Sequence, residues 1–101
     1  MEKDEVYNEE ELKRLSKMMS VVSNVTRLKI LYALLEGDKC VSQLQEETGC
    51  SQSLVSHQLQ ILKEYKLIRF EKNANKVIYS LIDDHIVQIL SMAREHILEE
   101  L

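Results

Sequence analysis

The chain has no proline and no tryptophan, and only two glycines and two cysteines among its 101 residues. Because few residues of this kind interrupt a helix, the composition predicts long helices with few breaks. Cys40 and Cys50 are too few for a disulfide framework and fit a reducing compartment. The chain has no apolar run of about 18 residues, the length of a membrane span, and its acidic segment 1–11 resembles no signal peptide. We therefore expect a soluble, cytoplasmic protein.

The composition suffices for one domain spanning residues 1–101. Apolar residues make up 45% of the chain, enough for a modest core that dimerisation would enlarge. The net charge is −4, but the charges are segregated. Residues 51–80 carry five basic and two acidic side chains, whereas residues 81–101 carry one basic and five acidic side chains. The local excess of basic side chains in residues 51–80 is therefore compatible with a nucleic-acid partner, despite the negative net charge.

Two helices are expected in the first half of the chain, after residues 1–8, which we expect to be disordered. Asn8 and Glu11 have the spacing of a capping box, and a second helix is expected from about Asn24 to a stop at Gly37. Apolar residues at helical spacing mark one side of each helix: Leu12, Leu15, Met18, Met19 and Val22 in the first, and Val25, Leu28, Leu31, Tyr32 and Leu35 in the second.

Two short helical segments follow, over residues 41–48 and 52–63. They are separated by a tight turn at Gly49, and Ser51 is placed to cap the second segment. Such a pair predicts a helix-turn-helix over residues 41–63. Its second helix would bury Val55, Leu59 and Leu62 and leave a polar face of Gln52, Ser53, Ser56, His57, Gln58 and Gln60.

Short hydroxyl and amide side chains near a helix N-terminus suit contacts with base edges and phosphates in a major groove. Taken alone, this face is explained equally well as a solvated surface. The segment 67–82 then alternates apolar and polar residues around a polar turn, which predicts a β-hairpin, or wing. Lys63 and the wing residues Lys72, Asn73, Asn75 and Lys76 are suited to phosphate contact. A solvated loop explains the lysines but not their position beside a helix of the recognition type.

The last helix, expected over residues 83–100, carries the motif D-x-H-x10-H-x2-E, formed by Asp83, His85, His96 and Glu99. Oxygen and imidazole donors of this kind suit zinc, with cobalt(II) as a mimic. At about 1.5 Å per residue, the two histidines lie roughly 16 Å apart on one helix, too far to share a metal. Two antiparallel copies remove the difficulty, since the motif is nearly symmetric about Ser91. The spacing therefore predicts a homodimer with two equivalent metal sites.

Each of these four residues also has a simpler interpretation. Asp83 could cap the helix, His85 and His96 could be ordinary interface residues beside Ile89 and Met92, and Glu99 could be a solvated terminal carboxylate. Capping and metal binding need not exclude each other. The joint spacing and its symmetry favour the metal site.

The chain resembles the ArsR/SmtB family of winged-helix metal-sensing repressors from about Leu12 to Glu99. The resemblance implies a mainly α fold with a small β-hairpin, and a homodimer formed through the N- and C-terminal helices. It also implies a repressor that leaves its operator when zinc binds, releasing genes of metal efflux or homeostasis. The matching segments are Val25-Thr26-Arg27-Leu28-Lys29-Ile30-Leu31, Ser51-Gln52-Ser53-Leu54-Val55-Ser56-His57-Gln58-Leu59, Tyr79-Ser80-Leu81 and the four-residue motif, which resembles that of the SmtB/CzrA-like zinc-sensing branch.

Family members also use a Cys-x-Cys metal site before the recognition helix. Here the first cysteine is Cys40, but the second position is Ser42, whose hydroxyl is a poor ligand for thiophilic ions. The sequence therefore predicts no working thiolate site. The alternative function from another class is a redox-responsive repressor that uses Cys40 and Cys50. Catalysis is not expected, since no nucleophile with a matched base is present.

Overall fold

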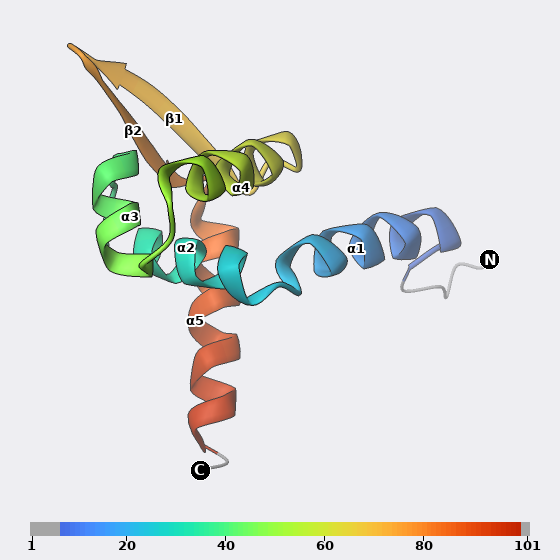
Figure 1. Ribbon diagram of the computed structural model, residues 1–101. Helices are drawn as coiled ribbons and strands as arrows, with labels where there is room; N and C mark the ends of the chain where they lie inside the picture. Colours follow the sequence, from blue (N-terminus) through green and yellow to red (C-terminus); the bar gives the residue numbers. More distant parts are fainter. Residues whose placement is uncertain (1–6, 100–101) are drawn as a thin grey trace.

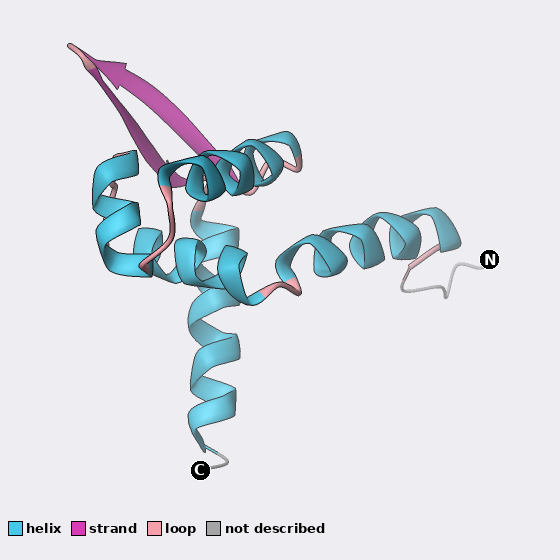
Figure 2. Ribbon diagram, in the orientation of Figure 1, coloured by secondary structure: helices cyan, strands magenta, loops and turns pink. Residues whose placement is uncertain are grey.

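The structure, a computed structural model, describes residues 7–99, and residues 1–6 of the segment 1–8 that we expected to be disordered lie outside this range. Within it, five helices and one antiparallel hairpin follow one another along the chain (Figures 1 and 2). Their bounds are α1 Glu9–Val22, α2 Val25–Glu36, α3 Val41–Thr48, α4 Gln52–Glu64, β1 Ile68–Asn73, β2 Lys76–Leu81 and α5 Asp84–Glu99. The expected mainly α fold with a small wing is confirmed.

The helix ends are set by local capping. The Asn8 side chain accepts from the Glu11 backbone N–H at 2.8 Å, and the Glu11 carboxylate accepts from the Asn8 N–H at 3.3 Å, which confirms the capping box. Ser51 Oγ accepts from the Leu54 N–H at 3.2 Å and caps α4 as expected. Gly49 ends α3 with φ 75°, a left-handed conformation that costs glycine least.

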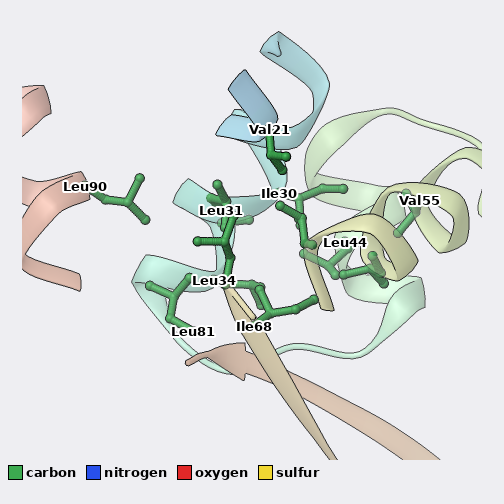
Figure 3. Close-up of a cluster of buried hydrophobic side chains, with 13 residues drawn as sticks. Val21, Ile30, Leu31, Leu34, Leu44, Val55, Ile68, Leu81 and Leu90 are labelled. Atoms are coloured by element: carbon green, nitrogen blue, oxygen red, sulfur yellow. The ribbon is translucent and has the colours of Figure 1, made fainter. Parts of the chain in front are cut away.

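Helix α2 lies at the centre of the core. Ile30 and Leu31 are fully buried and pack with residues of α3, α4 and the hairpin, among them Leu44, Val55 and Ile68 (Figure 3). The buried face expected for α2 was partly wrong, because Val25 is 70% exposed whereas Ile30, Ala33 and Leu34 are buried. Helix α2 is apolar on nearly all sides, so its tertiary neighbours rather than its own periodicity decide which residues are covered.

Helices α1 and α5 project from this body in different directions (Figure 1). In α1 the buried core residue is Val21, with Met18 and Val22 packed beside the core, and in α5 it is Leu90, with Ile86 and Val87 packed beside it. Their outer parts carry large exposed apolar side chains: Leu12, Leu15 and Met19 on α1, and Ile89, Met92, Ile97 and Leu98 on α5. Among the described residues, no single helix is long and apolar enough to cross a membrane, and only the bent pair α1 and α2 together meets that test, on length and composition alone.

Candidate nucleic-acid interface and metal-binding residues

Helix α4 presents its N-terminal half away from the core. Val55, Leu59 and Leu62 are buried, as their spacing predicted. The start of α4 lies beside the turn after α3 (Figure 1). Its polar side chains are exposed: Ser51, Gln52, Ser53, Ser56, His57 and Gln60. The arrangement leaves hydroxyl, amide and imidazole groups on one accessible surface, the geometry by which recognition helices enter a major groove.

Gln58 does not lie on this exposed surface, contrary to its expected place on the polar face of the helix. Its side chain is buried, and its Oε1 accepts a hydrogen bond from Arg27 Nε at 2.7 Å. Residue 58 lies three positions after Val55 and one before Leu59, at the edge of the buried side of α4. Its partner Arg27 lies 31 positions earlier in the chain, so the periodicity of α4 alone could not predict this contact.

The hairpin forms the expected wing. Its strands pair from Ile68 with Leu81 to Asn73 with Lys76, and the reversal takes place at Ala74 and Asn75. Ala74 adopts a positive φ of 60°, which a tight hairpin turn requires and which glycine or asparagine usually supplies. Four side chains at the tip that were expected to contact phosphate are all exposed: Lys72, Asn73, Asn75 and Lys76.

Lys63 connects the recognition helix with the wing. Its ammonium group lies 4.6 Å from the centre of the Phe70 ring on β1, a cation–π contact. The Phe70 ring in turn lies 6.1 Å from that of Tyr79 on β2. Lys63 is only partly exposed, and its contact with Phe70 places its ammonium group where α4 meets the wing.

The four candidate metal ligands lie at the two ends of α5. Asp83 Oδ1 accepts from the Ile86 N–H at 3.2 Å and so caps the helix, while Asp83 Oδ2 lies 3.5 Å from His85 Nδ1. The side chain of His85 is 88% exposed. His96 and Glu99 lie about three turns further along the same helix. Across residues 7–99, no three side chains of metal-binding type come together.

The Asp83–His85 end of α5 is joined to the end of the recognition helix through the backbone. The Ile82 N–H donates to the Leu67 carbonyl at 3.0 Å, and the Leu67 N–H donates to the Leu62 carbonyl of α4 at the same distance. A second link joins α5 to the core, where the Tyr32 hydroxyl donates to the Leu90 carbonyl at 2.8 Å. Helix α5 is therefore hydrogen-bonded directly to α2, and it is connected to the end of α4 through Ile82 and Leu67.

The two thiols lie at the starts of α3 and α4. Cys40 is buried, and its Sγ lies 3.2 Å from Ser42 Oγ. The Ser42 hydroxyl, helped by the backbone N–H of Gln43, lowers the pKa of the Cys40 thiol, and burial opposes this only in part. Cys50 is half-buried in the helix-turn-helix turn. Both cysteines are free.

Three helices with a recognition helix and a following β-wing define a winged helix-turn-helix DNA-binding regulator. The model of the arsR family of bacterial regulatory proteins matches residues 24–69. A transcriptional repressor SmtB homolog from Synechocystis is 30% identical over 95 residues, which cover 94% of this chain and 72% of that protein. The cadmium resistance regulatory protein CadC homolog of Staphylococcus aureus is 35% identical, over 80% of this chain and 68% of its own length.

Among solved structures, the winged helix-turn-helix domain of Mb0332 from Mycobacterium bovis superposes with a TM-score of 0.84 at 19% identity, covering 94% of this chain and 91% of that one. This likeness shows the fold. The sequence matches show the family: the chain belongs to the ArsR/SmtB family and is a transcriptional repressor of that family.

Proposed function

We propose that the protein is a zinc-responsive repressor that acts as a homodimer. Metal-free, the dimer binds operator DNA; zinc binding at two sites between the C-terminal helices releases it and derepresses genes of metal efflux or homeostasis. Asp83 and His85 of one protomer and His96 and Glu99 of its partner would hold each ion. Related proteins support a metal signal, since two of them are named after cadmium and arsenical resistance.

The observation that carries the proposal is the layout of α5. It is one helix without a break from Asp84 to Glu99, its ligand-type residues lie at its two ends, and the exposed apolar residues Ile89 and Met92 lie between them. A second α5 packed antiparallel on Ile89 and Met92 would bury this apolar surface and bring the opposite ends together. Two imidazoles and two carboxylates are a donor set that zinc accepts in a closed tetrahedral site.

For the DNA side, the polar surface of α4 would contact bases while the lysines hold phosphates. Base-reading residues would be Gln52, Ser53, Ser56 and His57, with Ser51 beside them, and phosphate contacts would come from Lys63, Lys72, Asn73, Asn75 and Lys76. The two recognition helices of the dimer, about 34 Å apart, would recognise a pseudo-palindromic operator. The contact of Lys63 with Phe70 would fix the wing relative to α4 on that DNA.

The two activities would be coupled through the connection from Asp83 to α4. Zinc would hold the first turn of α5, and the hydrogen bonds from Ile82 to Leu67 and from Leu67 to Leu62 would pass its position to the recognition helix. Zinc must then bind the conformation with low DNA affinity better, by about 1–3 kcal/mol in typical allosteric systems. The coupling is reciprocal, so operator DNA should weaken zinc binding to the same degree.

The test is a titration of the chain with cobalt(II) and zinc, combined with fluorescence anisotropy on a DNA duplex that the wild-type protein selects from a random-sequence pool. We expect one metal ion per chain, a tetrahedral cobalt spectrum and release of the duplex by zinc. His96→Ala should abolish these effects, whereas Asp84→Ala, which removes a neighbouring carboxylate outside the motif, should keep them. Zinc release that survives in His96→Ala would reject the site.

A thiol-based redox repressor is the second candidate, favoured by the lowered pKa of Cys40. In that mechanism oxidation at Cys40 and Cys50 would displace DNA without metal. The double variant Cys40→Ser/Cys50→Ser separates the two functions in the same anisotropy assay. Zinc sensitivity kept in the double variant supports the metal mechanism, whereas loss of peroxide sensitivity with zinc-independent binding supports the thiol mechanism.

A further inference from the structure

Arg27 of α2 is hydrogen-bonded to two other helices. Its guanidinium donates through Nε to Gln58 Oε1 of α4 at 2.7 Å, and through Nη1 to the Val21 carbonyl of α1 at 2.8 Å. Its backbone N–H donates to Asn24 Oδ1 at 3.0 Å, at the start of α2. One side chain therefore ties the end of the first helix to the middle of the recognition helix.

Besides this link, Lys17 of α1 lies over the ring of Tyr65 at the end of α4, 5.9 Å from its centre. The Val21 carbonyl is among the last four of α1, which lack partners within their own helix, and Arg27 satisfies it. A groove of about 350 Å³ lies between α1 and the second half of α4, lined among others by Val21, Arg27 and Ile61. The two helices are thus not packed tightly against each other there, and Arg27 spans the gap.

We propose that Arg27 and Gln58 form a positioning pair that sets the angle between α1 and the recognition helix. Gln58 then serves DNA binding from inside the protein, through Arg27, and touches no base. The proposal rests on the proposed function in one respect: α1 carries the exposed residues Leu12, Leu15 and Met19, on which a second copy would pack. The Arg27–Gln58 pair would therefore set the distance between the two recognition helices of the dimer.

Charge and burial support this assignment. A hydrogen bond that involves a charged guanidinium is stronger than one between neutral groups, and a partly buried arginine left without its acceptor is costly. The acceptor on Gln58 can be kept or removed with little change of size. Gln58→Glu keeps an oxygen in place and adds an opposite charge, whereas Gln58→Met removes the acceptor.

The first experiment measures the ratio of affinities for a duplex selected by the wild-type protein from a random pool and for a scrambled duplex of the same length. Gln58→Met should lower this ratio about tenfold, the change expected from losing one charge-assisted hydrogen bond, with the loss spread over all positions of the selected site. Gln58→Glu should keep the ratio within about twofold, because scrambled DNA cancels the general effect of added negative charge.

A base-contacting Gln58 would give the opposite pattern. Gln58→Glu would then be at least as damaging as Gln58→Met, and the loss would fall on one base pair. Either result would overturn the proposal. Arg27→Met is the partner variant, and Arg27→Met combined with Gln58→Met should do no more damage than Arg27→Met alone.

Hydrogen exchange tests the positioning without DNA. The N–H groups of Ser23 and Asn24 at the junction of α1 and α2 donate to carbonyls of α1. In Gln58→Met they should exchange about tenfold faster, while in Gln58→Glu they keep the wild-type rate and α5 is unaffected in both. Unchanged exchange in Gln58→Met would refute the pair. If the wild-type protein selected no duplex, the DNA-reading proposal would fail, and this exchange result would still decide whether the pair positions α4.

Discussion

At the scale of single residues, Cys40 shows how one neighbour sets the chemistry of a side chain. The Ser42 hydroxyl, 3.2 Å from Sγ, stabilises the thiolate and lowers the pKa of Cys40. The thiolate therefore forms at lower pH in the folded chain than in the unfolded one. Its contribution to stability is complete above the unfolded pKa and is lost as the pH falls through the folded pKa.

Ser42→Ala should raise the pKa of Cys40, because it removes the largest cause of the shift. We expect the midpoint of thiolate ultraviolet absorbance, measured against pH in a Cys50→Ser background, to move upward. Ser42→Thr keeps the hydroxyl and is the control that should hold the midpoint near its original value. An unmoved midpoint in Ser42→Ala would mean that the backbone N–H groups alone stabilise the thiolate.

Single residues also mark the limit of what the sequence could predict. The caps Asn8 and Ser51 were predictable because each bonds a backbone group three positions away. Gln58 was placed on the wrong side because its partner Arg27 belongs to another helix. The positions of the four metal-ligand candidates along α5 followed from helical geometry, whereas in the proposed site the side chains around them would come from a second chain.

At the scale of elements, the end of α4 contains a local strain that can be relieved. The Leu67 N–H bonds the Leu62 carbonyl and the Lys66 N–H bonds the Lys63 carbonyl, which together form a Schellman motif. The residue in its left-handed position is Lys66, with φ 60°, where glycine is usual. A residue with a Cβ costs roughly 1–2 kcal/mol in this conformation.

Lys66→Gly should therefore stabilise the fold by about 0.5–1 kcal/mol, after the larger entropy of glycine in the unfolded chain is subtracted. Urea denaturation followed by circular dichroism would measure it. Tyr65→Gly is the matched control, since residue 65 has φ −91° and gains nothing from glycine. Equal effects of the two substitutions would contradict the strain argument.

At the start of α5, the two carboxylate oxygens of Asp83 contact different groups. Oδ1 of Asp83 caps the helix and Oδ2 faces His85. Asp83→Asn should keep the cap and cost little stability, but weaken zinc binding because the carboxylate charge is lost. Asp83→Ala should lose both, at a cost of about 1 kcal/mol for the cap. Thermal melting and zinc titration of the two variants measure these effects separately, and equal melting temperatures would exclude a capping role.

Helix α2 shows why element bounds were easier to predict than buried faces. Its start at Asn24 and its end at Gly37 follow from the cap and from glycine, and both agree with the structure. Its covered side was predicted less well, because a helix that is apolar all round has no preferred face of its own. Contacts of α2 with α3, α4, α5 and β2 bury Ile30, Ala33 and Leu34 and leave Val25 exposed.

At the scale of the whole molecule, the fold divides into a packed body and two projecting helices. The body holds the core and the exposed polar surface of α4, while α1 and α5 expose apolar residues that the rest of the described chain does not cover. Such exposed apolar surface marks an interaction site. The sequence did not predict this division: the symmetry of the D-x-H-x10-H-x2-E motif and the family resemblance predicted a homodimer, and contacts within one chain do not test a surface that a second chain would cover.

The antiparallel pairing of two α5 helices that we propose can be tested with neither metal nor DNA. If the two-fold axis passes near Ser91, Ile89 of one protomer lies opposite Met92 of its partner, both now exposed. In a Cys40→Ser/Cys50→Ser background, mixing Ile89→Cys and Met92→Cys chains should give a disulfide-linked heterodimer, since a disulfide needs Cα atoms about 4.4–6.8 Å apart. Mass spectrometry after oxidation would measure the yield.

Each variant oxidised alone should give less covalent dimer than the mixture, because its two cysteines lie on opposite sides of the axis. Replacing Met92→Cys with Arg94→Cys should abolish the product, since residue 94 lies on the other side of α5. A high yield of the Met92→Cys homodimer would shift the axis toward residue 92 and separate His85 from the partner's His96. The shared zinc site would then be excluded on geometry alone.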